Sequence, residues 1–169
     1  IAGTSADYGP DWAAILETDC DAAFLERLEA LCERETARSL APIGDPLGVL
    51  ARIAGRGLVL GILTNDTEHA ARVQATRLGL NRHLSSIIGY DSGHGYKPSP
   101  APVLAFADLH AVSPNAIAVV GDSRHDLAAA RAAGAMAIAV LSGVATRDEL
   151  APHADLVVDD ITALEALFA

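Results

Sequence analysis

From residue 47 onward, short apolar runs alternate with helical segments, and this alternation constrains the fold more than any other feature of the chain. Continuous apolar runs such as Leu58–Leu63 and Ile117–Val120 are typical of strands that are buried on both faces of a sheet. Helical patterns separate these runs, as at Thr67–Leu78 and Pro100–Leu109. The alternation therefore predicts an α/β fold with a doubly wound parallel sheet. The same patterns predict helices over 47–55, 127–133 and 161–168, and strands over 86–89, 136–141 and 156–158.

The N-terminal part of the chain follows a different pattern. Residues 11–40 carry apolar side chains at helical spacing and contain no strand, so we expect a helical appendage there. The turn cluster at 41–46 is rich in proline and glycine, which end regular structure, and it marks a boundary. We therefore predict two parts, a helical region over 1–40 and an α/β core over 41–169.

The composition agrees with a globular domain and limits its partners. Hydrophobic residues make up 51% of the 169 residues, which is enough to bury a core. The net charge of −10 argues against binding to nucleic acid or to an anionic membrane surface, and no apolar run is long enough to span a bilayer. Cys20 and Cys32 fall in one expected helix, about 18 Å apart, which is too far for a disulfide. Unpaired thiols fit a reducing cytoplasm.

One strand end carries two carboxylates and is the strongest candidate for a functional site. Gly121 ends the apolar run Ile117–Val120, and Asp122 and Asp126 follow where an alanine-rich helix begins. Open α/β sheets bind ligands at the carboxyl ends of their strands, and a carboxylate there suits a hard cation such as Mg²⁺. The same pattern also suits an ordinary turn in which aspartate caps the next helix.

Two other strand ends carry polar residues. Thr64 and Asn65 follow the run at 58–63, where a hydroxyl and backbone N–H groups can cradle a phosphoryl group, or where either side chain can cap the next helix. Lys97 is the sole lysine and ends an irregular loop after the strand at 86–89. It can neutralise a phosphate and a carboxylate together, although a solvated loop lysine is the common alternative. If the three strands are adjacent, a hydroxyl, an ammonium and a carboxylate meet in one crevice and match phosphoryl transfer.

In this order the three motifs resemble those of the haloacid-dehalogenase-type phosphohydrolases, and most closely the phosphoglycolate-phosphatase-like branch. Leu63–Asn65 is similar to the second motif of that superfamily, Lys97-Pro98 to the third, and Gly121–Asp126 to the fourth. The resemblance covers roughly residues 41–169 and implies a Rossmann-like core. Residues 1–40 then correspond to part of a helical cap.

The resemblance implies a role for each residue. The Thr64 hydroxyl binds a phosphoryl oxygen, with help from the Asn65 backbone, and Lys97 offsets charge on the nucleophile and the phosphate. Asp122 ligates Mg²⁺, and Asp126 orients a water or Lys97 without touching the metal. The implied cofactor is Mg²⁺, and the implied partner is a small phosphorylated metabolite.

The superfamily's first motif is not recognisable in this sequence. That motif is an apolar strand ending in Asp-x-Asp, whose first aspartate is the nucleophile and whose second is the general acid/base. Asp19-Cys20-Asp21 has the spacing but lies in a segment with helical periodicity, where Asp19 or Asp21 is expected to divide two helices. We therefore expect both aspartates upstream of Ile1, which leaves the core without its first strand. Open strand edges then favour association, such as a homodimer.

The complete protein is thus expected to be a Mg²⁺-dependent phosphatase that acts through an aspartyl-phosphate. One alternative is an inactive relative that binds a phosphorylated ligand or partner without turnover. Another is a sugar-phosphate mutase of the same superfamily, since mutase and phosphatase differ in cap and first-motif residues. Asp122 counts against a metal-free dehalogenase. A receiver-type regulator carries its acidic pair early in the chain, whereas Asp122 and Asp126 come late.

Overall fold

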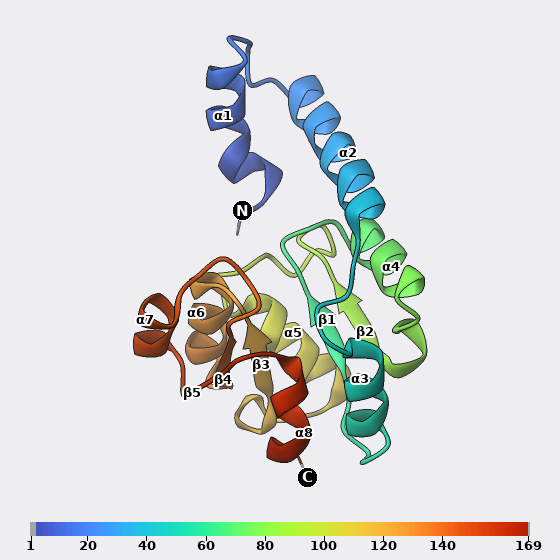
Figure 1. The fold of residues 1–169 in the computed structure, drawn as a ribbon. Helices are drawn as coiled ribbons and strands as arrows, with labels where there is room; N and C mark the ends of the chain where they lie inside the picture. The colour runs from blue at the N-terminus through green and yellow to red at the C-terminus, as the bar shows by residue number, and fades with distance from the viewer. Residues whose placement is uncertain (1–2, 169) are drawn as a thin grey trace. The chain divides into compact units, whose positions relative to one another are not determined.

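The computed structural model describes residues 3–168, and contacts divide the chain into two compact units, Ile1–Ala41 and Pro42–Ala169 (Figure 1). The first unit is a pair of helices, α1 (Ser5–Ile15) and α2 (Ala22–Ser39). Their contact buries Ala13 of α1 against Phe24 and Leu28 of α2. None of the helices formed by residues 3–168 is long and apolar enough to cross a membrane.

The helical nature of the first unit agrees with its sequence pattern, with two differences in detail. The first helix begins well before residue 11, because Thr4 and Asp7 form a capping box at its N-terminus. The expected break falls at Asp21, whose carboxylate accepts a 2.7 Å hydrogen bond from the Phe24 N–H and so begins α2. Cys20 therefore lies in the exposed connection and not in one helix with Cys32. No strand precedes Asp19 in the described structure, so Asp19-Cys20-Asp21 does not end a strand.

The second unit alternates strands and helices, and the predicted α/β architecture with parallel strands is confirmed. Its elements are α3 (Pro46–Ala54), β1 (Gly61–Leu63), α4 (Glu68–Arg77), β2 (Ser86–Ile88), α5 (Ala101–His110), β3 (Ala118–Gly121), α6 (Arg124–Ala133), β4 (Met136–Val140), α7 (Arg147–Leu150), β5 (Leu156–Val158) and α8 (Leu164–Leu167). Strand β1 pairs with β2, and β4 lies between β3 and β5; all of these pairings are parallel.

Helices cover both faces of the strands, because successive strand residues point to opposite sides. On one face, Val119 of β3 and Ala137 of β4 pack with α5, α6 and α7. On the other face, Ile138 of β4 packs with Val49 of α3 and Leu164 of α8. The core therefore has the two helical layers that a doubly wound sheet requires.

The sheet is interrupted between β1 and β3, and we call this place the break. Among residues 3–168, no ladder of backbone hydrogen bonds joins these two strands. They are nevertheless neighbours: Leu60, just before β1, shares one core with Val120 of β3, and Leu63 shares the other core with Val119. The break is thus bordered by two unpaired strand edges and covered by packed side chains on both faces.

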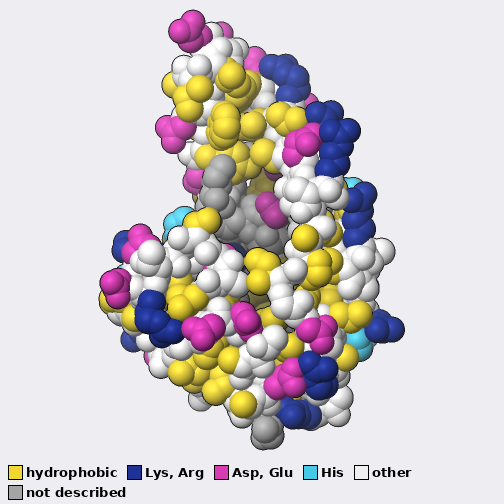
Figure 2. Space-filling view, viewed as in Figure 1, with side chains coloured by type: hydrophobic (Ala, Val, Ile, Leu, Met, Phe, Trp, Pro, Cys, Tyr) yellow, Lys and Arg dark blue, Asp and Glu magenta, His cyan; other side chains and the backbone are white. Residues whose placement is uncertain are grey.

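Charged side chains of both signs are interspersed over the second unit on the face shown in Figure 2. Arg52 contacts Glu165 and lies 3.5 Å from Asp45, so this exposed arginine is paired with carboxylates. Such exposed pairs add little stability.

Candidate active site

Lys97, in the loop that follows β2, connects the carboxyl end of β1 with the helix that follows β3. The Lys97 ammonium donates a 2.8 Å hydrogen bond to the Leu63 carbonyl at the end of β1. It also lies 2.5 Å from Oδ1 of Asp126, in the first turn of α6. Both side chains are largely buried, with 13% of Lys97 and 9% of Asp126 exposed. The ammonium therefore bridges the break at its carboxyl end.

Asp126 is held from its other oxygen by Ser123. The Ser123 hydroxyl and N–H donate hydrogen bonds of 2.6 and 3.1 Å to Oδ2 of Asp126, which completes a capping box for α6. This cap explains why α6 begins at Arg124 and not at Leu127 as the helical pattern predicted. The Asp126 carboxylate thus takes part in the capping box of α6, whose N-cap residue is Ser123, and it also pairs with Lys97.

The side chain of Asn65 forms two hydrogen bonds with the backbone of Lys97, and the sequence did not predict this contact. Its side-chain oxygen accepts a 2.9 Å hydrogen bond from the Lys97 N–H, and its side-chain nitrogen donates a 2.8 Å hydrogen bond to the Lys97 carbonyl. The only signal in the sequence was the position of an asparagine at the end of a strand. We call Asn65, Lys97, Ser123 and Asp126 the lysine cluster.

Thr64 and Asp122 lie at the same strand ends but outside the hydrogen bonds of the lysine cluster. The Thr64 hydroxyl accepts a 3.0 Å hydrogen bond from the Asp66 N–H, within its own turn. Asp122 is exposed and makes no hydrogen bond or ion pair with any residue in the described range 3–168. An uncommitted carboxylate at a strand end can accept a cation, whereas Asp126 is already neutralised by Lys97.

A single carboxylate does not complete a divalent metal site. Among residues 3–168, no group of three or more His, Cys, Asp or Glu side chains is placed to hold a metal ion. Mg²⁺ is bound through oxygen ligands and retains several waters, so Asp122 fits as one ligand of such a site.

Two glycines allow close approaches around these carboxylates. A Cβ at Gly121 would overlap the side chain of Asp126, and a Cβ at Gly143 would overlap the carboxylate of Asp122. Gly143 lies in the loop after β4, so this loop passes directly against Asp122. Both glycines are needed for the observed positions of the acidic groups.

The loop that leads to Lys97 is fixed to the start of α4. The Asp91 carboxylate accepts a 2.7 Å hydrogen bond from the Glu68 N–H, and the Ser92 hydroxyl donates a 2.5 Å hydrogen bond to the Glu68 carboxylate. The bond from Ser92, followed by that from the Arg72 guanidinium, lowers the pKa of Glu68 below its ordinary value of 4.5. The loop is therefore anchored at two points before it reaches Lys97.

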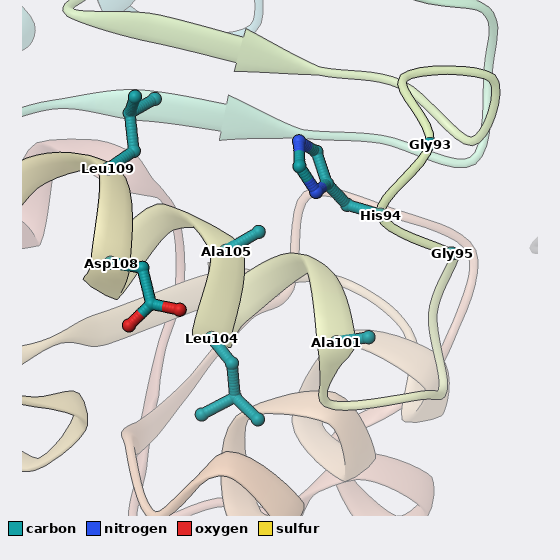
Figure 3. A pocket seen from close by; sticks show the side chains of 8 residues that line it. All are labelled: Gly93, His94, Gly95, Ala101, Leu104, Ala105, Asp108 and Leu109. Atoms are coloured by element: carbon teal, nitrogen blue, oxygen red, sulfur yellow. The ribbon is translucent and has the colours of Figure 1, made fainter.

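A separate hollow of about 750 Å³ lies on the outward face of α5 (Figure 3). Gly93, His94 and Gly95 form one side of it, and Leu104 and Asp108 of α5 line the other. It shares no lining residue with the lysine cluster, and His94 belongs to its lining.

Comparison with known proteins identifies the family to which this arrangement belongs. The family model described as haloacid dehalogenase-like hydrolase matches residues 12–140, which is most of the chain. The chain belongs to this haloacid dehalogenase-like family. The superfamily membership that the sequence predicted is thereby confirmed.

Relatives place this haloacid dehalogenase-like chain beside phosphoglycolate phosphatases. It is 42% identical over 122 residues to a phosphoglycolate phosphatase of Chromobacterium violaceum, a match that covers 72% of this chain and 53% of that protein. It is 36% identical over 139 residues to a phosphoglycolate phosphatase of Xanthomonas campestris pv. campestris, covering 80% of this chain and 61% of the relative. The chain thus spans between half and two thirds of the length of these relatives.

The fold of this haloacid dehalogenase-like chain also matches a solved structure. A hydrolase from Pseudomonas syringae aligns with a TM-score of 0.83 at 22% identity, over 99% of this chain and 78% of that one. A likeness at this identity concerns the fold alone.

Proposed function

We propose that the complete protein is a Mg²⁺-dependent phosphatase acting on a small phosphorylated metabolite through an aspartyl-phosphate. The observation that carries the proposal is the largely buried Lys97 ammonium, held at the strand ends by the Leu63 carbonyl of β1 and by Asp126 of α6. A cation fixed there can neutralise a phosphoryl group and an attacking carboxylate together. The phosphoglycolate phosphatases among its relatives make phosphoglycolate the first substrate to test.

Each residue at the strand ends receives a proposed role. Thr64 and the backbone of Asn65 bind phosphoryl oxygens, where free donors at a strand-to-helix turn favour an anion. Lys97 balances the negative charge that gathers during transfer, and Asp126 holds its ammonium in place. Asp122 would hold Mg²⁺, which supplies charge neutralisation to the phosphoryl oxygens when bound.

The nucleophile and the general acid/base are proposed to lie on a strand outside these 169 residues. The break supports this, because it borders two unpaired parallel edges whose carboxyl ends meet at Lys97. A parallel strand paired with β1 and β3 would bring the residues at its carboxyl end beside that ammonium. The helical unit at 1–40 is proposed to be part of a cap, and the cytoplasmic location expected from the unpaired cysteines is part of the same proposal.

Phosphate release from phosphoglycolate and from an aryl phosphate, with Mg²⁺ or with a chelator, tests the proposal on the product of the full coding sequence. We expect Mg²⁺-dependent turnover, and we expect Asp122→Asn to lower it by about 100-fold or more. The matched control is Asp159→Asn, because Asp159 also directly follows a strand, β5, and is exposed. Equal loss in both variants would contradict the assigned role of Asp122.

The 169-residue chain by itself is expected to show no turnover. Mg²⁺-dependent hydrolysis by this chain alone would refute a nucleophile that lies outside it. A full-length protein that binds the phosphorylated compound without hydrolysing it would instead favour the non-enzymatic alternative. Transfer of the phosphoryl group to a second position of a sugar phosphate would favour the mutase. Self-association of the isolated chain, measured by sedimentation, would agree with the open edges at the break.

A further inference from the structure

The carboxamide of Asn65 makes contacts that phosphate binding does not explain. Both of its polar atoms are used on one residue 32 positions away, the oxygen on the Lys97 N–H at 2.9 Å and the nitrogen on the Lys97 carbonyl at 2.8 Å. The carboxamide of asparagine carries a donor and an acceptor in one planar group. The backbone of Lys97 is therefore held from both sides by a single side chain.

Helix capping does not account for these contacts. The cap of α4 is Thr67, whose hydroxyl accepts a 3.1 Å hydrogen bond from the Ala70 N–H. The hydroxyl of Thr64 serves the turn itself by accepting from the Asp66 N–H. The carboxamide of Asn65 is thus directed across the strand ends to Lys97.

We propose that Asn65 is a positioning residue whose side chain determines where the Lys97 ammonium stands. The lysine side chain is long and loses much rotational freedom when it is fixed. With its backbone held by Asn65, the ammonium reaches both the Leu63 carbonyl and Asp126, at 2.8 and 2.5 Å. The catalytic meaning of this position rests on the proposed function, whereas the positioning itself does not.

The composition of the chain gives an unusually clear test, because it has one lysine and one methionine. A chain labelled with ¹⁵N-lysine and ¹⁵N-methionine, with a tag that contains neither, has two labelled internal amides. One is Lys97, bonded to Asn65. The other is Met136, whose N–H donates a 2.9 Å hydrogen bond to the Ile117 carbonyl beside β3. Hydrogen exchange at the Met136 amide therefore reports on the stability of the sheet, and exchange at the Lys97 amide reports on its hydrogen bond with Asn65.

Asn65→Ala is expected to speed hydrogen exchange at Lys97 by about tenfold, the factor that corresponds to one lost hydrogen bond. Exchange at Met136 should stay near the wild-type rate. The matched control is Asn81→Ala, which removes an asparagine whose side chain bonds only locally, to the Thr76 hydroxyl. Unchanged exchange at Lys97 in the Asn65 variant would overturn the proposal.

A second measurement tests the position of the ammonium. A small amine-reactive reagent modifies the Lys97 ε-amine, and peptide mass spectrometry gives the rate of modification. We expect slow modification in the wild type and Asn81→Ala, and about tenfold faster modification in Asn65→Ala. Wild-type rates in Asn65→Ala would overturn the proposal. These readouts do not require turnover, so they can fail or succeed independently of the phosphatase assignment.

If Asn65→Ala also loses protection at Met136, the near-isosteric Asn65→Asp decides the question. Aspartate keeps the acceptor for the Lys97 N–H but cannot donate to the Lys97 carbonyl. Faster modification of the ε-amine with Met136 still protected would support positioning by the donor. A modification rate equal to that of the wild type would overturn the proposal.

Discussion

Asp126→Asn is the substitution that tests the lysine cluster most directly. The Asp126 side chain is 9% exposed, and it neutralises the ammonium of a lysine whose side chain is 13% exposed. Asparagine keeps the size of the side chain and an oxygen that can accept from Ser123, so the capping box of α6 is largely preserved. The change therefore removes the negative charge from the pair, and among residues 3–168 it leaves the Lys97 ammonium with the Leu63 carbonyl alone.

The expected cost follows from that uncompensated charge. Removing one partner of a buried ion pair costs about 3–5 kcal/mol, and the retained hydrogen bonds of the amide place this case near the lower end, at about 3 kcal/mol. With a urea m-value of about 2 kcal/mol per molar, the unfolding midpoint should fall by about 1.5 M. That is a large part of the about 5–15 kcal/mol that stabilises a typical domain.

The assay is urea unfolding followed by far-UV circular dichroism. Tryptophan fluorescence is unsuitable, because the single tryptophan, Trp12, lies in the first unit and does not report on the α/β unit. The matched control is Glu149→Gln, which alters the capping box of α7 with Thr146. That carboxylate is exposed and has no buried lysine partner, so its midpoint should change far less.

A double-mutant cycle separates the ion pair from other effects. Lys97→Met removes the ammonium and keeps an unbranched stem, so Asp126→Asn should cost about 2 kcal/mol less in that background than in the wild type. Additive costs would show that the two side chains do not stabilise each other. A midpoint shift in Asp126→Asn no larger than that of Glu149→Gln would refute the reasoning.

Three further predictions follow from close contacts and from one pKa. The added methyl group in Gly143→Ala would overlap the Asp122 carboxylate. The Mg²⁺ affinity of the full-length protein, measured by calorimetry, should therefore weaken about tenfold. Unchanged affinity would show that Asp122 does not bind the metal. Gly121→Ala would overlap Asp126, so the free energy of unfolding in urea should fall by about 1–3 kcal/mol, and no change would contradict the crowding. The lowered pKa of Glu68 means that its carboxylate stabilises the fold above its ordinary pKa of 4.5 and that this stability is lost as pH falls through the lowered value. The unfolding midpoint should therefore decline less between neutral and acidic pH in Glu68→Gln, and equal declines would refute this.

The α/β fold could be predicted because its strands are continuous apolar runs and its helices are not. The bounds of elements were harder to predict, since they depend on partners. The run Leu58–Leu63 becomes a strand only at Gly61, because β2 supplies partners for three residues, in the register that pairs Gly61 with Ser86. Leu58 and Val59 remain 39% and 43% exposed before the ladder begins. Periodicity reports on burial, whereas strand bounds also need the register of a neighbour.

Some features of the candidate site could likewise be predicted from the sequence, and others could not. That Asp122 and Lys97 follow strands can be read from sequence, because strand ends in a parallel sheet lie at one edge. The hydrogen bonds between Asn65 and the Lys97 backbone could not be predicted from the sequence, because the two residues are 32 positions apart and the contact depends on the geometry of a loop. Side-chain pairs far apart in sequence leave no periodic trace, so the supporting residues of a site are found only in three dimensions.

Because of the break, Lys97 also has a structural role, and this role affects how substitutions of Lys97 must be interpreted. Strands β1 and β3 lack a backbone ladder between them in the described structure, and Lys97 links the end of β1 to Asp126, in the helix that follows β3. A residue that ties two parts of a sheet and is also proposed to face the phosphate affects stability and catalysis together. Loss of activity in a Lys97 variant therefore identifies a charge requirement only if Lys97→Arg, which keeps the positive charge, is compared with Lys97→Met at matched fractions of folded protein. Equal losses in both would point to the geometry of the link, because guanidinium and ammonium differ in shape while they share the charge.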